Sequence, residues 1–540
     1  MPAPRKTAKT VVAVKTETEL ALKRLMSRET KSSPTASHLI IEALAGTGKT
    51  TTLIEGLKFA KGLATKVQPS DQQRVIWEAV HKLASKAQSV GFVCFNKSIA
   101  TELQSRVPAG CAAMTLHSHG FRAVTAAFGR VRVSEYRVND LIGKVLDKDP
   151  KELWKAKPTL ITATQDLVAL CKQTLLLAPT DEDLDDLTSY YDIELNGSRN
   201  EVYDLVPKVL KACLDVNADR EIDFNDMIWL PVALGLPVTK YDVLFVDEAQ
   251  DLNRCQQELA SMSAKRLVLV GDRNQAIYGF AGADVRSIDR MEETLSATEA
   301  NCIVLPLTKT YRCGKAIVAL AKTLVPAFEA AETNGPGYVG EYRFEDEAEN
   351  CYTKFVKDGD MVLCRVNAPL VSQCFRFLAA GKKACILGRD IGKGLITTIR
   401  KLKADNVADL LMKLSDWAEA EGRKEAAKKR PSEAKLIMVE DRKACLEVFC
   451  EAARTIDDII AKIESIFQDS SRSGVVFSSI HKAKGKEAKN VYLLQLAGAC
   501  VPHPMAKSEW QREQENNLHY VAITRGIESF SYVRGKFEKK

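Results

Sequence analysis

Short apolar runs recur along the chain, each bounded by polar residues or glycine. The first covers residues 38–42, and the positions after it have helical spacing: Leu53, Ile54, Leu57 and Ala60. Further apolar runs lie at residues 90–95, 243–246, 266–270, 362–364, 474–477 and 491–494. Runs of this kind are typical of parallel strands that are buried on both faces. The alternation of such strands with helical segments predicts an α/β fold with parallel sheets.

Two stretches depart from this alternation. Residues 123–222 have a mostly helical pattern and contain an acidic run at 181–186, and residues 381–472 are rich in lysine and glutamate. Charge runs of this kind usually form the solvated faces of helices. We therefore expect two helical insertions in two α/β domains, behind a basic N-terminal tail. The expected ranges are 1–37 for the tail, 38–122 and 223–296 for the first domain, 123–222 for its insertion, 297–380 and 473–540 for the second domain, and 381–472 for its insertion.

Composition narrows the class of protein without identifying a function. The chain has 540 residues, 46% of them apolar and 27% charged, as in large soluble enzymes of several domains. No apolar run approaches the ~18 residues of a membrane span, so we expect no membrane partner. The 14 cysteines show no paired metal-site spacing, which favours reduced thiols in a cytoplasmic protein. The net charge of +7 permits a polyanionic partner but does not require one.

A glycine-rich loop follows the first predicted strand and opens the first predicted helix. Glycines allow backbone N–H groups to approach phosphates, and the helix N-terminus favours negative charge. We expect Lys49 to reach the β- and γ-phosphates and Thr50 to bind Mg²⁺ through its hydroxyl. The expected nucleotide-binding residues of this loop are Ala45, Gly46, Thr47, Gly48, Lys49, Thr50 and Thr51.

An acidic pair follows the apolar run at 243–246. Asp247 and Glu248 lie at the carboxyl end of this strand, where parallel sheets place ligand sites. We expect Asp247 to complete the Mg²⁺ site and Glu248 to orient or deprotonate the attacking water. An acidic pair at this position could instead cap a helix. Together with the glycine-rich loop, it predicts hydrolysis of a nucleoside triphosphate.

Further motifs occur in a fixed order along the chain and resemble those of the UvrD/Rep group of superfamily 1A DNA helicases. The segments that carry the resemblance lie at residues 95–97, 115–118, 223–227, 247–251, 271–283, 307–312, 479–487 and 518–525. The resemblance implies two RecA-like domains that face an ATP cleft, each with a helical insertion. It also implies ATP and Mg²⁺ as cofactors, translocation on single-stranded DNA in the 3′ to 5′ direction, and unwinding of duplex.

The resemblance also implies roles for residues around the nucleotide. Gln275 would couple the γ-phosphate to DNA, and Arg312 and Arg525 would act as arginine fingers. Tyr311 would stack on adenine, with Gly485 and Glu487 near the nucleotide. Arginine fits this role because its guanidinium is always charged and binds phosphate oxygens in a fork.

The implied DNA partners are single strands and single/double-strand junctions. Aromatic rings stack on unpaired bases of any sequence, and a loop that contains Tyr278 and Phe280 would present such rings. Buried core positions are the alternative for these two residues. The other residues implied to contact DNA are Phe95, Asn96, Lys97, Thr115, His117, Arg365, Asn367 and His481. Either histidine could instead have a purely structural role.

Three positions depart from the family pattern. Residues 28–36 contain no glutamine to recognise adenine, Lys486 replaces an apolar residue, and the segment at 95–97 lacks one residue. The second insertion is also shorter than in the large bacterial members. Three alternatives therefore remain: a translocase that does not unwind, a P-loop enzyme that is not a motor, and a motor that acts on RNA. The compartment we expect is the cytoplasm of a bacterium, or of the host cell for a viral protein.

Overall fold

The chain forms two compact units, each built around a parallel sheet. The computed structural model describes residues 38–94, 97–191, 193, 195, 197–277, 286–297, 302–344, 351–427, 433–468, 474–504, 506 and 509–535. The first unit contains residues 38–43, 48–273 and 278–307, and the second contains residues 44–47, 274–277 and 308–540. The expected N-terminal tail lies outside the described residues.

The sheet of the first unit has six strands in the order β3-β2-β6-β7-β1-β8, and every neighbouring pair is parallel. Its strands are β1 (His38–Ala43), β2 (Val90–Val93), β3 (Cys111–Met114), β6 (Tyr241–Val246), β7 (Ala264–Gly271) and β8 (Cys302–Leu307). The four residues of β2 are all buried, as are the last four of β6 and the last five of β7. Burial on both faces explains why these segments are apolar without alternation.

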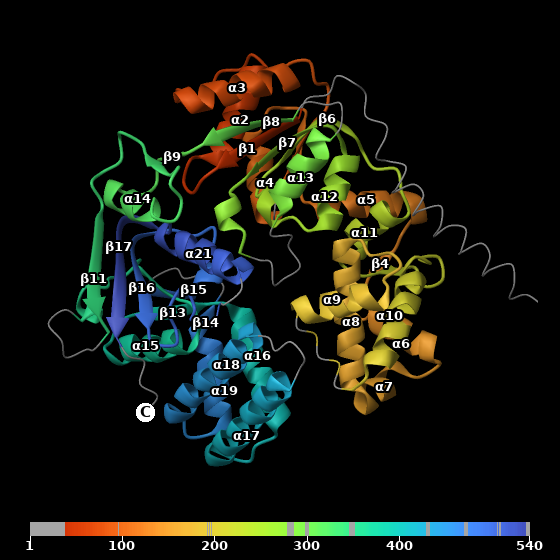
Figure 1. The fold of residues 1–540 in the computed structure, drawn as a ribbon, viewed down its shortest axis with the longest axis vertical. Helices are drawn as coiled ribbons and strands as arrows, with labels where there is room; N and C mark the ends of the chain where they lie inside the picture. The colour runs from red at the N-terminus through yellow and green to blue at the C-terminus, as the bar shows by residue number, and fades with distance from the viewer. Residues whose placement is uncertain are drawn as a thin grey trace, which may run out of the picture. The chain divides into compact units, whose positions relative to one another are not determined.

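Helices cover both faces of this sheet (Figure 1). One face packs against α2 (Lys49–Ala60), α3 (Asp71–Ala84) and α4 (Lys97–Arg106). The other packs against α5 (Leu116–Phe128), α11 (Asp226–Ala233), α12 (Arg254–Met262) and α13 (Ser287–Ser296). Alternate residues of one strand serve the two faces, since Leu39 and Ile41 join the first core and Ile40 joins the second. Two short 3-10 helices follow the central strands: η2 (Ala249–Asp251) and η3 (Arg273–Gln275).

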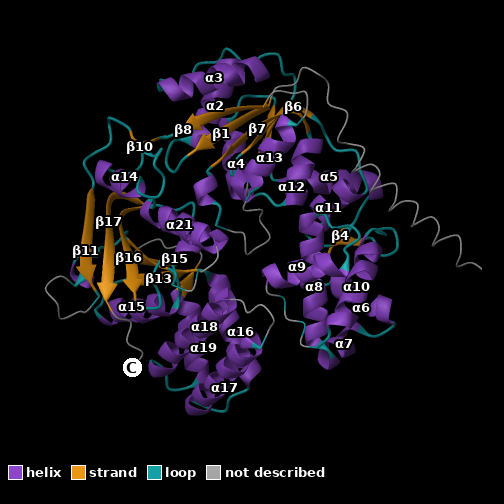
Figure 2. Cartoon of the chain, in the orientation of Figure 1, coloured by secondary structure: helices purple, strands orange, loops and turns teal. Residues whose placement is uncertain are grey.

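A helical layer separates α5 from α11 in the sequence (Figure 2). Its members are α6 (Arg137–Leu146), α7 (Pro150–Ala156), α8 (Pro158–Thr174), α9 (Asp181–Tyr191) and α10 (Arg199–Cys213). The short strands β4 (Arg132–Val133) and β5 (Glu221–Ile222) pair with each other where the chain enters and leaves this layer. The acidic run at 181–186 begins α9, where negative charge at a helix N-terminus is favourable.

The sheet of the second unit has seven strands in the order β11-β17-β16-β12-β15-β13-β14, again all parallel. The strands are β11 (Tyr338–Arg343), β12 (Met361–Cys364), β13 (Ala384–Leu387), β14 (Phe467–Gln468), β15 (Val475–Ser479), β16 (Ala488–Leu496) and β17 (Gly526–Gly535). The short pair β9 (Lys309–Thr310) and β10 (Glu329–Ala330) lies outside this sheet.

The helices of the second unit fall into two groups. Those that share a core with one face of the sheet are α15 (Ala368–Ala379), α16 (Arg389–Leu402), α17 (Val407–Ala426), α18 (Glu433–Glu451) and α19 (Ile456–Ile466), together with residues of η5 (Tyr352–Lys354). The others, which contact β15 and β17, are α14 (Lys315–Ala321), α20 (Ile480–Ala483) and α21 (Glu509–Ile523). The expected fold class of two parallel-sheet α/β domains with many helices is confirmed.

Three strands lie outside the ranges that the sequence indicated for their sheets. β8 belongs to the first sheet, because its six residues pair with β1, although residues from 297 onward were expected in the second domain. β13 and β14 belong to the second sheet, although both lie in the range 381–472 that was expected to be helical.

All fourteen cysteines are free thiols. Among the residues described, no helix combines the length and apolar character needed to cross a bilayer.

Candidate functional site

The glycine-rich loop has the backbone geometry of an anion site. Gly46 and Gly48 adopt left-handed conformations with φ of 68° and 79°. The Thr47 hydroxyl donates to the carbonyl of Leu44 at 2.8 Å, which closes the turn. α2 then begins at Lys49, so its first N–H groups have no partner within the helix. The loop and helix N-terminus can therefore bind phosphate through backbone N–H groups.

Two residues at the start of α2 contact the acidic pair that follows β6. The Thr50 hydroxyl donates to Oδ2 of Asp247 at 3.0 Å, and Nζ of Lys49 lies 3.2 Å from Oε2 of Glu248. Burial and the Glu248 carboxylate raise the pKa of Asp247 to about 6. Burial opposes the charge of Lys49, but Glu248 and Asp247 together raise its pKa. A hydroxyl, two carboxylates and an ammonium group thus lie close together.

Gln250, a position of the motif at 247–251 to which the sequence assigned no role, also lies at this site. Its Nε2 donates to Oε2 of Glu248 at 2.6 Å, and its Oε1 accepts the N–H of Asp272 at 3.1 Å. A Cβ on Gly271 would lie 2.5 Å from Oε1 of Gln250, so only glycine allows this approach. Gln250 therefore connects the acidic pair with the end of β7. Its position between the acids of residues 247–251 was the signal that could have identified it.

In the second unit, two predicted arginines lie next to each other. Nε of Arg312 pairs with Oε2 of Glu487 at 2.6 Å, and its Nη1 donates to the carbonyl of Thr524 at 3.3 Å. Arg525 is 2% exposed and donates to the carbonyls of Val521 and Lys486. Both guanidiniums are held by backbone groups around the end of α21.

The second unit also includes the loop residues 44–47. The N–H of Tyr311 donates to the carbonyl of Gly46 at 2.9 Å, and the N–H of Ala45 donates to the Tyr520 hydroxyl at 3.1 Å. A Cβ on Gly46 would lie 2.6 Å from Cβ of Arg312. The Tyr311 side chain remains 46% exposed, so its ring is available to a ligand. Gly485 has a left-handed conformation with φ of 79° and lies in an exposed turn.

One predicted DNA contact of the first unit, His117, forms an aromatic pair with Phe224, a residue to which the sequence assigned no role. The rings of His117 and Phe224 stack with centroids 4.1 Å apart, and Phe224 is 60% exposed. Burial lowers the pKa of His117 to about 4, so the imidazole is neutral at physiological pH. Thr115 caps α5, because its hydroxyl accepts the N–H of Ser118. Lys97 is exposed at the start of α4.

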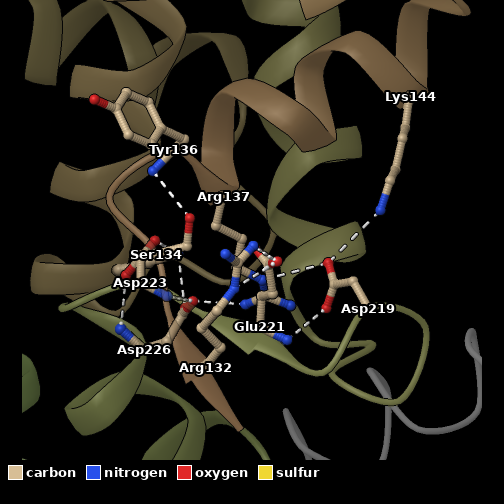
Figure 3. A network of polar contacts seen from close by, with 10 residues as sticks. Arg132, Ser134, Tyr136, Arg137, Lys144, Asp219, Glu221, Asp223 and Asp226 are labelled. Atoms are coloured by element: carbon tan, nitrogen blue, oxygen red, sulfur yellow. Dashed lines mark hydrogen bonds and ion pairs between the residues drawn. The ribbon is translucent and has the colours of Figure 1, made fainter.

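A buried ionic network holds the segment that carries Phe224 (Figure 3). Asp226 is fully buried, with Nη1 of Arg137 2.6 Å from Oδ2 and Nζ of Lys172 2.7 Å from Oδ1. Lys172 also pairs with Asp223. Asp223 and Asp226 exchange backbone-to-carboxylate hydrogen bonds of 2.8 and 2.9 Å. Because α6 supplies Arg137 and α8 supplies Lys172, the helical layer fixes both ends of the turn around Phe224.

The predicted DNA contacts of the second unit are engaged with other side chains. Nε of Arg365 lies 2.8 Å from Oε1 of Glu515. The side-chain amide of Asn367 donates to Oδ2 of Asp441 at 2.9 Å, and its N–H also donates to that carboxylate. Burial, with Arg365 nearby, lowers the pKa of His481 to about 3, which keeps the ring neutral. Four other predicted contacts lie outside the described residues: Phe95, Asn96, Tyr278 and Phe280.

Comparison with known families agrees with the motifs. Residues 26–296 match the model of the UvrD/REP helicase N-terminal domain, and residues 397–529 match the UvrD-like helicase C-terminal domain. F-box DNA helicase protein 1 of Schizosaccharomyces pombe is 24% identical over 528 residues, which cover 90% of this chain and 54% of that protein. ATP-dependent DNA helicase PcrA of Staphylococcus aureus is 31% identical over 163 residues, which cover 26% of this chain and 22% of that protein.

The chain thus spans about half the length of the yeast relative and less of the bacterial one. Among solved structures, Arterivirus nonstructural protein 10 (helicase) with DNA matches at 14% identity and a TM-score of 0.24, over 56% of this chain and 42% of that one. A similarity of this size carries no argument about the site.

Proposed function

Because this chain belongs to the UvrD/Rep helicase family, we propose that it is an ATP-dependent DNA helicase that moves 3′ to 5′ on single-stranded DNA and unwinds duplex. The observation that carries the proposal is the group formed by Lys49, Thr50, Asp247 and Glu248 at the loop between β1 and α2. This group supplies each function that triphosphate hydrolysis requires: a cation for phosphate, oxygen ligands for a metal and a carboxylate for water.

The donor set fits a magnesium ion. Mg²⁺ prefers oxygen ligands, and the Thr50 hydroxyl and Asp247 carboxylate already lie 3.0 Å apart. The ion would neutralise charge on the β- and γ-phosphate oxygens. Lys49 would exchange its pairing with Glu248 for the phosphates, which would release the Glu248 carboxylate to accept a proton from water. Gln250 would keep that carboxylate oriented through its 2.6 Å hydrogen bond.

The second unit would contribute positive charge. Arg312 and Arg525 would stabilise the negative charge that develops on the transferred phosphoryl group, an effect that can contribute about 10³–10⁵-fold in rate. Tyr311 would cover the adenine with its exposed ring, and Gly485 and Glu487 would lie near the nucleotide. Gln275 would couple the presence or absence of the γ-phosphate to the position of the DNA-binding residues.

The exposed Phe224 ring would stack on an unpaired base, with His117 behind it. Stacking does not discriminate between bases, which suits a protein that must follow any strand. Lys97, Arg365 and His481 would contact the phosphate–sugar backbone. The partners we propose are single-stranded DNA and junctions between single and double strands.

The test is ATP hydrolysis with and without a single-stranded oligonucleotide, compared between wild type, Lys49→Ala and Lys82→Ala. Lys82 is an exposed lysine of α3 and serves as the matched control. We expect strong stimulation by the strand in wild type and Lys82→Ala, and none in Lys49→Ala. Turnover that is indifferent to DNA and RNA would contradict the helicase proposal. Duplexes with a 3′ or a 5′ tail then test polarity, and hydrolysis without strand separation would favour a translocase that does not unwind.

A further inference from the structure

Three successive backbone carbonyls around Gln275 accept hydrogen bonds from side chains of the second unit. Nζ of Lys484 donates to the carbonyl of Gln275 at 2.6 Å. Nδ2 of Asn517 donates to the carbonyl of Ala276 at 3.3 Å, and Nε2 of Gln514 donates to that of Ile277 at 3.2 Å. Residues 274–277 begin three residues after the end of β7 at Gly271, but they belong to the second unit. The donors therefore explain why this strip belongs there.

Two of the donors share one face of a helix. Gln514 and Asn517 lie three residues apart on α21, a spacing that places side chains next to each other. Three residues further along α21, the hydroxyl of Tyr520 accepts the N–H of Ala45 in the glycine-rich loop. One face of α21 thus contacts both the strip at 274–277 and the strip at 44–47.

The three bonds constrain the backbone rather than one side chain. Each carbonyl belongs to a different peptide plane, and together the three bonds fix the backbone from Gln275 to Ile277. Gln275 and Ala276 are each 5% exposed and Ile277 is fully buried, so water offers little replacement for a lost donor. A buried carbonyl without a hydrogen-bond donor is unfavourable. We therefore expect residues 275–277 to shift when the side-chain amides of Gln514 and Asn517 are removed.

We propose that Lys484, Gln514 and Asn517 are positioning residues that hold Gln275 in the orientation needed for DNA-stimulated ATP hydrolysis. The inference rests on the proposed function, since it assigns a role to these residues within that reaction. None of the three donors needs to touch the nucleotide. They act through the backbone of the strip that carries Gln275.

Isosteric substitutions test the amide donors with little change in size. Gln514→Glu and Asn517→Asp each replace an NH₂ donor with a carboxylate oxygen that faces a carbonyl. Asn516→Asp is the matched control for Asn517→Asp, because Asn516 is the exposed neighbour of Asn517 on the same helix and each substitution adds one negative charge. Asn517→Gln keeps an amide donor and should restore much of the activity.

We expect the double variant Gln514→Glu/Asn517→Asp to lower the DNA-stimulated kcat by about 10-fold, as the loss of two neutral hydrogen bonds in the transition state implies. The KM for ATP should change by less than about two-fold, because the substituted groups do not bind the nucleotide. Asn516→Asp should match wild type, and thermal melting of all variants in ATP checks that they are folded. A defect in KM with kcat unchanged would also oppose the proposal.

The experiment distinguishes failure of the positioning role from failure of the proposed function. If wild type is stimulated by DNA and the double variant matches Asn516→Asp, the positioning role is wrong and the helicase proposal stands. If wild type itself is not stimulated by DNA, the proposed function fails and the positioning role fails with it.

Discussion

The buried ionic network of the first unit gives a prediction that tests whether Asp226 is charged. Asp226→Asn keeps the size of the side chain and one carboxyl-like oxygen but removes the negative charge. Its two cationic partners, Arg137 and Lys172, have no exposed side-chain surface. In the variant both cations stay buried with fewer anions beside them. Asp223 still pairs with Lys172, and Asp219 lies 3.7 Å from Nε of Arg137.

Removing one partner of a buried ion pair costs about 3–5 kcal/mol, because the remaining charge is left without full compensation. The two short contacts to Asp226, 2.6 and 2.7 Å, support a value within that range. Asp219→Asn is the control, since its side chain is 12% exposed and its carboxylate lies 3.7–3.8 Å from its two cationic partners. Its 3.0 Å hydrogen bond from the N–H of Glu221 can be kept by the amide oxygen of asparagine. We expect that variant to lose about 1 kcal/mol or less, as for a partly solvated pair.

Because the chain has two units, the loss of stability is best measured near the substituted residue, by native-state hydrogen exchange. The slowest amides of α6, α8 and α11 should exchange at least about a hundred-fold faster in Asp226→Asn, following from a loss of 3 kcal/mol or more. Burial raises the pKa of Asp226. Exchange that is the same in both variants would therefore mean that this carboxyl is protonated at neutral pH, and the ion-pair reasoning would be refuted.

Two further predictions concern the aromatic and histidine residues of the first unit. Phe224→Ala should weaken binding of a single-stranded oligonucleotide by about 1–3 kcal/mol, measured by fluorescence anisotropy. Tyr136→Ala removes another exposed ring and should leave binding unchanged. Equal losses of affinity in the two variants would contradict the stacking role of Phe224. Burial, and then Arg122, lower the pKa of His119 to about 4, so the folded state resists a proton that the unfolded state binds below about pH 6.5. The contribution of His119 to stability is therefore complete above pH 6.5 and should fall by about 2 kcal/mol at pH 5. His119→Gln should reduce the pH dependence of urea unfolding between these two pH values by about that amount, and the other buried histidines should account for the rest.

The central strands were predictable from sequence because burial on both faces leaves a continuous apolar run. β6 and β7 are of this kind, and their ends locate Asp247 and Asp272. β8 was not among the predicted strands; it is an edge strand that contains Pro306, and only its last residue, Leu307, is buried. Proline is tolerated in edge strands but argues against a central strand, so it weakens the strand signal of this apolar run. β13 has only four residues within a lysine-rich stretch, too few for a periodic signal.

The contacts among Lys49, Thr50, Asp247 and Glu248 were predictable, because short motifs specify which residues meet at the ends of adjacent strands. Contacts between residues that lie far apart in the sequence could not be predicted. Asp441 of α18 accepts the side-chain amide of Asn367 at 2.9 Å, and no spacing in the sequence relates these two residues. The hydrogen bonds of Gln514 and Asn517 could not be predicted either. Their acceptors are backbone carbonyls, which every residue has, so the sequence at 276–277 does not indicate them.

The place of β1 in its sheet has a consequence for synthesis of the chain on the ribosome. β1 lies between β7 and β8, so Leu39 pairs with Val268 on one side and with Ile303 on the other. A nascent chain that ends before residue 264 contains β1 but neither of its neighbours. The glycine-rich loop therefore gains its rigid support late in translation. Until β7 emerges, the apolar strand β1 has no sheet to join and its backbone hydrogen-bonding groups have no neighbouring strand to pair with.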